Sequence, residues 1–323
     1  MDDIDRGKKV GVGQVSLLFS ITIALFVFIG FRVQAREFYS GALITEFGLI
    51  MLPGVLFLLL FKYDLKYVLR LNPISPLNLL IIFIIMILAI PLVAVFNLLN
   101  LLLVKAIFGT VMVTEIPVAE NARELLLNLL VIAGSAGVCE EVLFRGIIQR
   151  GFEKLGALRA ILLASFLFSI THMDFQKIFG TFLLGALIGF IVYRTNSIYG
   201  GMFAHFTNNA VAVVLAYLSN RLVSLVRDSG LNAGYTDINS VLSTLADIPP
   251  DQLIIVFFIY GMIFLFVAVL FVLLIFAFCR MNPLKGRFDV YSPQISGGKT
   301  SGAGKLIWLL PGITMVAVIF IMQ

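Results

Sequence analysis

The sequence predicts an all-α polytopic membrane protein, a bundle of about nine transmembrane helices (eight to nine) with a polar cavity between the helices. Of the 323 residues, 60% are hydrophobic and 13% are charged, and the mean hydropathy is +1.06. Soluble domains carry about 25% charged residues, so a large soluble domain is excluded. The adjacent Glu140 and Glu141 predict the cavity, because a carboxylate at membrane depth costs about 2.5–3.5 kcal/mol on insertion scales.

A transmembrane helix needs about 20 predominantly apolar residues. The apolar residues 100–114 either extend the third span or lie along the membrane interface, and the segment 157–172 is short. We group the chain into N-terminal helices (1–121, about three spans), a central core (122–219) and an outer loop with two C-terminal spans (220–323). The nine candidate spans are 15–33, 42–61, 77–99, 122–143, 157–172, 177–193, 198–219, 252–279 and 306–322.

Lysine and arginine residues favour the cytoplasmic loops of membrane proteins. With the N-terminus inside, the predicted inner loops carry 15 of these residues and the outer loops carry 7. This distribution predicts a cytoplasmic N-terminus, an outer loop at 220–251 and an inner loop at 280–305. It also accounts for the net charge of +5 without a nucleic-acid partner. Compact loops and the lack of an endoplasmic-reticulum retention signal favour a multi-pass protein of a bacterial cell membrane.

The rare ionisable residues of the core fall into three short motifs. The first runs from Glu140-Glu141 to Arg145, and the second from Phe168 to His172. Residues four apart share a helix face, so Glu141 and Arg145 are expected to pair. Adjacent residues diverge by about 100°, so Glu140 is expected to point elsewhere than Glu141.

The third motif contains His205 and Asn209, which also share one helix face. The sequence around Gly156 predicts the turn of a helical hairpin, with Glu140 and His172 each 16 residues from this glycine. At a rise of about 1.5 Å per residue, both lie about 24 Å from the turn. Helix periodicity therefore lets the two residues meet His205 and Asn209 in one cavity.

These residue types suit the hydrolysis of an amide. A carboxylate and a neutral imidazole can share the activation of a water molecule. An imidazole and an amide N–H can donate to a developing oxyanion. The core offers no serine or cysteine with an evident base, and Cys139 is expected to be a small buried hydrophobe. The motifs therefore predict water attack activated by Glu140.

The ordered motifs EExxxR, FxxxH and HxxxN resemble those of the CAAX-prenyl endopeptidase and bacteriocin-processing (CPBP, or Abi) intramembrane proteases. The resemblance covers about 120–215. It implies a glutamate-dependent CAAX-type protease that acts on a peptide or on a prenylated or otherwise membrane-bound protein in the lipid bilayer. It implies the following roles: Glu140 and His172 activate water, His205 and Asn209 form the oxyanion site, and Glu141, Arg145 and Phe168 support the site.

Other functions stay open from the sequence. Glu140, His172 and His205 are also zinc-ligand types, but HExxH is absent, so a metal-free reaction without a cofactor is favoured over a zinc-dependent one. The ionisable residues also suit the relay of a proton-coupled carrier, or the partner site of a non-catalytic scaffold or bacteriocin-immunity protein. Glu46, another carboxyl group at membrane depth, is interpreted as a cavity or partner residue, and Asn97 and Asn100 as interhelical contacts.

Overall fold

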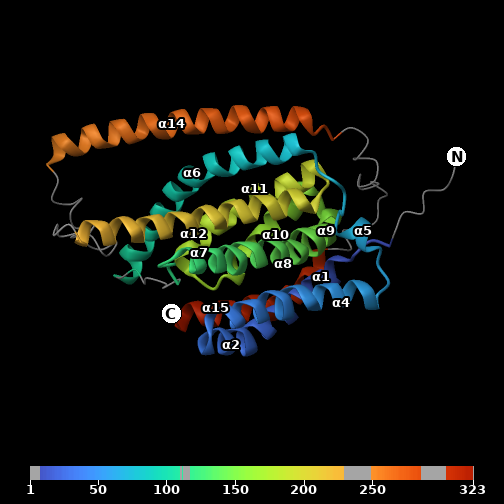
Figure 1. Cartoon of the computed structure of the whole chain (residues 1–323). Helices are drawn as coiled ribbons and strands as arrows, with labels where there is room; N and C mark the ends of the chain where they lie inside the picture. Colours follow the sequence, from blue (N-terminus) through green and yellow to red (C-terminus); the bar gives the residue numbers. More distant parts are fainter. Residues whose placement is uncertain (1–7, 110, 112–116, 229–248, 285–302, 323) are drawn as a thin grey trace.

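The computed structural model describes residues 8–109, 111, 117–228, 249–284 and 303–322, which contain helices and no strand (Figure 1). Eight helical segments in these ranges are long and apolar enough to cross a membrane, which confirms the predicted all-α polytopic class. The loops expected at 220–251 and 280–305 lie largely outside the described residues.

Several crossing segments combine α-helical with π-helical or 3₁₀-helical turns. The N-terminal elements are α1 (Val12–Leu25), η1 (Phe26–Gly30), α2 (Phe31–Arg36), α3 (Phe38–Leu43), η2 (Ile44–Met51), α4 (Leu52–Leu60), α5 (Leu65–Val68) and α6 (Pro76–Phe108). The central elements are α7 (Ala122–Asn128), η3 (Leu129–Ser135), α8 (Ala136–Glu141), η4 (Val142–Ile148), α9 (Gln149–Phe152), η5 (Glu153–Leu155), α10 (Ala157–Thr171), η6 (Phe175–Lys177), α11 (Ile178–Thr195) and α12 (Ile198–Asp228). The C-terminal elements are α14 (Pro250–Met281), η8 (Ala303–Leu309) and α15 (Leu310–Met322).

The third and fifth expected spans differ in length from the other spans. Helix α6 has 33 residues, so the apolar residues after position 99 extend the third span as far as Phe108. Helix α10 has only 15 residues. At about 1.5 Å per residue it is about 22 Å long, less than the hydrocarbon thickness of about 30 Å. The segment expected at 157–172 is therefore a short apolar helix of the bundle and not a full-length span.

A tight turn lies at each end of α10 and limits its length. Gly156 has φ +105°, a conformation that favours glycine, and it connects α9 and η5 to the start of α10. Helix α10 packs along α11, and the chain between them turns at Met173, which has φ +50°. His172, which caps the C-terminus of α10, thus lies within the depth of the longer helices.

The turns between the spans gather at the two ends of the bundle. In Figure 1, α5 and α9 lie at one end, whereas α2 and α7 lie at the other. At the α5 end, Lys8 Nζ donates to the carbonyl of Phe61 at 3.0 Å, and the Lys305 side chain lies beside Gly13. The first and last spans therefore start at the same end, and α1 packs along η8 and α15.

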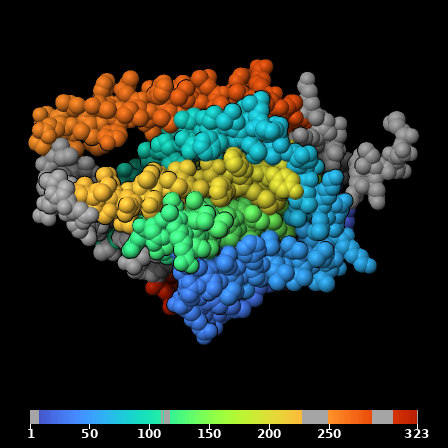
Figure 2. Space-filling view, viewed as in Figure 1, coloured from blue at the N-terminus to red at the C-terminus, as the bar shows by residue number. Residues whose placement is uncertain are grey.

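Helix α14 lies at the outside of the bundle, next to α6 (Figures 1 and 2). The amides of Asn282 and Asn78 bond to each other at 2.8 and 3.3 Å, and Phe278 is buried against the neighbouring helices. Most other apolar side chains of α14 are exposed, as expected for a helix that faces lipid. The three polar motifs lie elsewhere, between α8, α10 and α12.

Candidate active site

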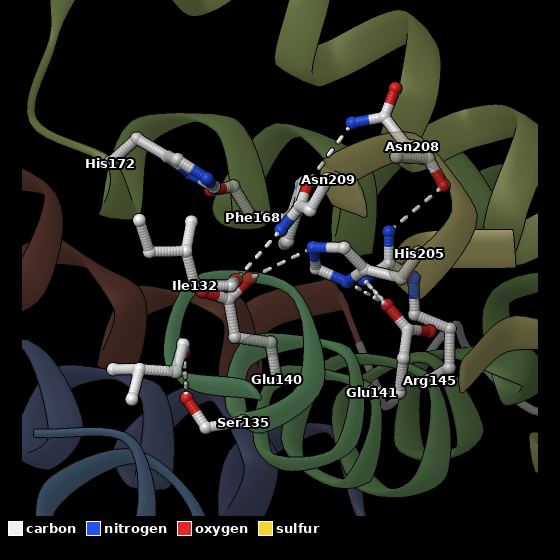
Figure 3. A network of polar contacts seen from close by, with 12 residues as sticks. Ile132, Ser135, Glu140, Glu141, Arg145, Phe168, His172, His205, Asn208 and Asn209 are labelled. Carbon is white, nitrogen blue, oxygen red and sulfur yellow. Dashed lines mark hydrogen bonds and ion pairs between the residues drawn. The ribbon is translucent and has the colours of Figure 1, made fainter. Parts of the chain in front are cut away.

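The adjacent glutamates lie at the C-terminal end of α8, between the π-helical segments η3 and η4. Their carboxyl groups point in different directions, as shown in Figure 3. The Glu141 side chain is fully buried, whereas that of Glu140 is 12% exposed and lines a cavity. Single π-helical turns inside α-helices are frequent at functional sites, because they change the direction of neighbouring side chains.

Glu141 connects two basic side chains. Its Oε1 accepts a hydrogen bond from Arg145 Nη1 at 2.7 Å and contacts His205 Nδ1 at 2.9 Å. Arg145 also donates from Nη2 to the carbonyl of Gly185 at 3.2 Å. A carboxylate paired with a guanidinium only accepts hydrogen bonds, so Nδ1 of His205 carries its proton. The Nε2 atom then faces Glu140, with 3.9 Å between Nε2 and Glu140 Oε2.

Two glycines allow α12 to approach this part of the chain closely. A Cβ atom on Gly201 would lie 2.9 Å from Glu141 Oε2 and 2.4 Å from the Val192 side chain. A Cβ atom on Gly137 would lie 3.2 Å from the backbone nitrogen of Phe206. Small residues at such contacts let helix backbones come together. This close packing brings His205 of α12 next to the glutamates of α8.

Phe168 of α10 lies at the centre of the aromatic and cationic contacts. Its ring makes edge-to-face contacts with His172 at 4.8 Å and His205 at 5.7 Å between ring centroids. It also contacts Phe144, and the Arg145 guanidinium lies 4.3 Å from its centroid. Such cation–π and edge-to-face contacts are favourable in a desolvated setting. Phe168 thus packs against both histidines and the arginine.

His172 is exposed at the end of α10 and lines the same cavity as Glu140. Its Nδ1 lies 3.0 Å from the carbonyl oxygen of Phe168, an acceptor, so Nδ1 is the protonated nitrogen. This bond leaves Nε2 available as a base or an acceptor. The turn after His172 is held by Asn100 of α6, whose Nδ2 donates to the carbonyls of Phe175 and Gln176 at 3.0 and 2.8 Å.

Asn209 lies one turn after His205 and also lines the cavity. Its Nδ2 donates to the carbonyl of Ile132 at 3.3 Å, and its Oδ1 accepts from Asn208 Nδ2 at 3.0 Å (Figure 3). The two bonds determine which end of the Asn209 amide is the donor. Asn208 is a site residue that the motif spacing does not predict, and its position beside Asn209 in HFTNN is the signal that could have indicated it.

The cavity has a volume of about 410 Å³ and is lined by residues from both the N-terminal spans and the core. Glu140, His172 and Asn209 contribute to its wall, together with Glu46 and Lys177. His205 is buried beside the cavity, where it contacts the glutamates. Three of the four predicted catalytic residues therefore share one cavity, and the fourth lies behind Glu140.

Both histidines considered as zinc ligands have one ring nitrogen in a hydrogen bond. His205 directs Nδ1 to Glu141, and His172 directs Nδ1 to a carbonyl oxygen. In the described parts of the chain, no three His, Cys, Asp or Glu side chains are grouped so that they could hold a metal ion. Cys139 is buried and unpaired with another cysteine.

Comparison with known protein families gives a match in the central part of the chain. The model of the family described as "Type II CAAX prenyl endopeptidase Rce1-like" matches residues 122–211, which include all three motifs. No curated protein and no solved structure matches the chain. The matched segment runs from the start of α7 into α12 and contains Glu140, His172, His205 and Asn209. Residues 122–211 of this multi-pass membrane protein are thus similar to the Rce1-like endopeptidases, which agrees with the resemblance that the three motifs predict.

Proposed function

We propose that this protein is a glutamate-dependent intramembrane endopeptidase that hydrolyses a peptide bond in a lipidated or membrane-associated substrate. The observation that supports this function best is the shared cavity of Glu140, His172 and Asn209, with the second glutamate bound to Arg145 behind it. The Rce1-like match at 122–211 supports a CAAX-type substrate, which carries a prenylated cysteine near its C-terminus.

In this proposal a water molecule in the cavity is the nucleophile. The Glu140 carboxylate accepts a proton from the water, whose oxygen attacks the carbonyl carbon of the substrate, while His172 Nε2 orients the water. The carbon–nitrogen bond then breaks, and the proton passes from Glu140 to the leaving nitrogen. The second proton of the water stays on the new carboxyl group until it is transferred to the amine, so the products at neutral pH are a carboxylate and an ammonium group.

The negative charge on the substrate oxygen needs donors during the reaction. Asn209 Nδ2 has a second hydrogen beyond the one that it shares with Ile132. His205 donates from Nε2 only as an imidazolium, because its Nδ1–H is bound by Glu141. We therefore assign the oxyanion to Asn209 and to a doubly protonated His205, which Glu141 holds in place.

We propose that the end of the bundle with α5 and the Gly156 turn faces the cytoplasm of a bacterial cell. Lys8, Lys62, Lys66 and Arg159 belong to this end, in agreement with the preference of basic residues for cytoplasmic loops. The cavity then lies toward the other half of the bilayer. Labelling of single cysteines at positions 66 and 251 in intact cells tests this orientation, and protection at position 251 with labelling at position 66 would contradict it.

Cleavage of a farnesylated CAAX peptide by the protein in proteoliposomes tests the proposed reaction. We expect Glu140→Gln and His172→Ala to abolish measurable cleavage, with unchanged expression and thermal stability. Asp251→Asn, an exposed carboxyl-to-amide change at the start of α14, is the control and should cleave like the unmodified protein. Full cleavage by the Glu140→Gln protein would contradict the mechanism. Glu140-dependent ion flux without cleavage would favour a carrier.

A further inference from the structure

We propose that Glu46, in the second span, is a positioning residue for Glu140, to which its protonated carboxyl group donates a hydrogen bond. The proposal rests on the proposed function of Glu140 as the base that activates water. Glu46 lies outside the matched segment 122–211, 94 positions before Glu140. The inference thus assigns part of the active site to the N-terminal helices.

The two carboxyl groups come from neighbouring elements and share the cavity. The π-helical segment η2 packs against α8, and both Glu46 and Glu140 line the cavity wall. The Oε2 atom of each is buried and has no hydrogen-bond partner among the described residues. Each glutamate therefore brings one buried, unpartnered carboxyl oxygen to the same cavity, and a single proton would let the two groups bond to each other.

A hydrogen bond between two carboxyl groups requires a proton, because ionised carboxylates only accept. The surroundings indicate which group holds the proton. Glu140 faces the His205 ring, with 3.9 Å between Oε2 and Nε2, whereas Glu46 has no Lys, Arg or His within ion-pair distance among the described residues. The charged form is therefore best placed on Glu140 and the neutral acid on Glu46. A bond from a neutral acid to a carboxylate is charge-assisted and strong, so it fixes the direction of the Glu140 carboxylate.

The local backbone determines the position of Glu46. A Cβ atom on Gly41 would lie 2.4 Å from the carbonyl oxygen of Val33, so the chain reverses tightly between α2 and α3. Thr45 then donates to the Gly41 carbonyl at 2.8 Å and accepts from Gln34 Nε2 at 3.0 Å. These contacts hold the start of η2 against the preceding span. Because η2 is π-helical, its side chains follow a wider turn than those of an α-helix, a feature frequent at functional sites.

Two substitutions of similar size separate donation from space filling. Glu46→Gln keeps a donor toward Glu140, whereas Glu46→Met keeps the volume and removes the donor. With the farnesylated peptide, we expect Glu46→Met to lower kcat by about tenfold to hundredfold, the effect of losing one hydrogen bond to a charged group, with KM unchanged. Because the Gln amide still donates to Glu140, we expect Glu46→Gln to keep kcat within about threefold of the unmodified protein.

Two kinetic results would overturn the proposal: full activity of Glu46→Met, or inactivity of Glu46→Gln equal to that of Glu140→Gln, which would make Glu46 a second ionised base. Glu140→Gln and His172→Ala, measured in parallel, report on the proposed function separately. If these two variants cleave normally, the proposed function fails. If they are inactive while Glu46→Met is fully active, only the role of Glu46 fails.

A second measurement needs no substrate. Infrared spectroscopy of the resting protein in lipid at neutral pH detects the carbonyl stretch of protonated carboxyl groups. We expect this band in the unmodified protein and its loss in Glu46→Gln, with Asp251→Asn as the unchanged control. Absence of the band from the unmodified protein, or its persistence in Glu46→Gln, would overturn the proposal.

Discussion

Two clusters of buried charge occupy opposite parts of the core, and they differ in what their carboxyl groups leave open. Near the Gly156 turn, Glu153 pairs with both Arg70 and Arg150, and each of its oxygens has a basic partner. Glu140 instead lines a cavity, and its Oε2 lies 3.9 Å from His205 Nε2, farther than a hydrogen bond. A carboxylate with both oxygens paired holds helices together, whereas one that faces a cavity is free to bind water.

The first cluster connects segments that are distant in sequence. Arg70 donates from Nε to Asn196 Oδ1 at 3.1 Å, and Asn72 Nδ2 donates to the Asn196 carbonyl at 2.7 Å. The Arg150 guanidinium also lies 4.5 Å from the centroid of Tyr67. This Arg70–Glu153–Arg150 cluster connects α5, the end of α9 and the turn between α11 and α12. Glu141 combines both situations, since it pairs with Arg145 and also contacts His205 beside the cavity.

The largest expected effect is on catalysis at Glu140. We expect Glu140→Gln to lower kcat by about 10²–10⁴-fold, the usual contribution of a general base. The unfolding temperature should stay unchanged, because the Gln side chain keeps the size of Glu140 and one acceptor oxygen. Cleavage and thermal unfolding of the same preparation check this expectation. A large fall in unfolding temperature would mean that Glu140 holds helices together, as Glu153 does, and would contradict the comparison.

A change in the Arg70–Glu153–Arg150 cluster should have the opposite effect, lowering stability and leaving kcat unchanged. Glu153→Gln leaves two buried guanidinium groups without their shared carboxylate, and breaking a buried ion pair costs about 3–5 kcal/mol. We expect a lower unfolding temperature and poor expression, with normal kcat in the protein that folds. The fraction of active sites, titrated with a tight inhibitor, separates folding from turnover. A low kcat at full folded fraction would contradict the comparison.

Glu141 is expected to show both effects at moderate size. Glu141→Gln weakens the bond to Arg145 and removes the charge beside His205. We therefore expect the free energy of unfolding to fall by about 1.5–3 kcal/mol, as for the loss of a hydrogen bond to a charged group. Both kcat and the unfolding temperature should fall. A double-mutant cycle with His205→Ala measures the coupling between the two residues. Strict additivity would mean that Glu141 does not act through His205.

The smallest expected effect concerns Asn208, which orients the Asn209 amide. We expect Asn208→Ala to lower kcat by about fivefold, which corresponds to a neutral hydrogen bond of about 1 kcal/mol. Asn209→Ala, the matched variant on the neighbouring residue, removes an oxyanion donor and should cost about 10²-fold or more. Equal effects of the two variants would remove the distinction between positioning and direct donation.

The sequence predicted the helical class and the position of each span well, because long apolar segments leave few alternatives in a bilayer. The shortness of the segment 157–172 was also predicted, and the 15-residue helix α10 confirms it. The pairing of Glu141 with Arg145 followed from their spacing on one helix. Contacts between helices, such as Asn100 with the turn after His172, have no such local rule.

What the sequence by itself determined is the set of polar residues placed in an apolar chain, their spacing on each helix and their order in three motifs. Only the tertiary structure decided which of these residues meet. Gly201 and Gly137 set the approach of α12, and the α2–α3 reversal sets the position of η2, so that His205 and Glu46 reach α8. The reason is physical: helix periodicity fixes the face and depth of a side chain, but the neighbour of that face depends on how the helices pack.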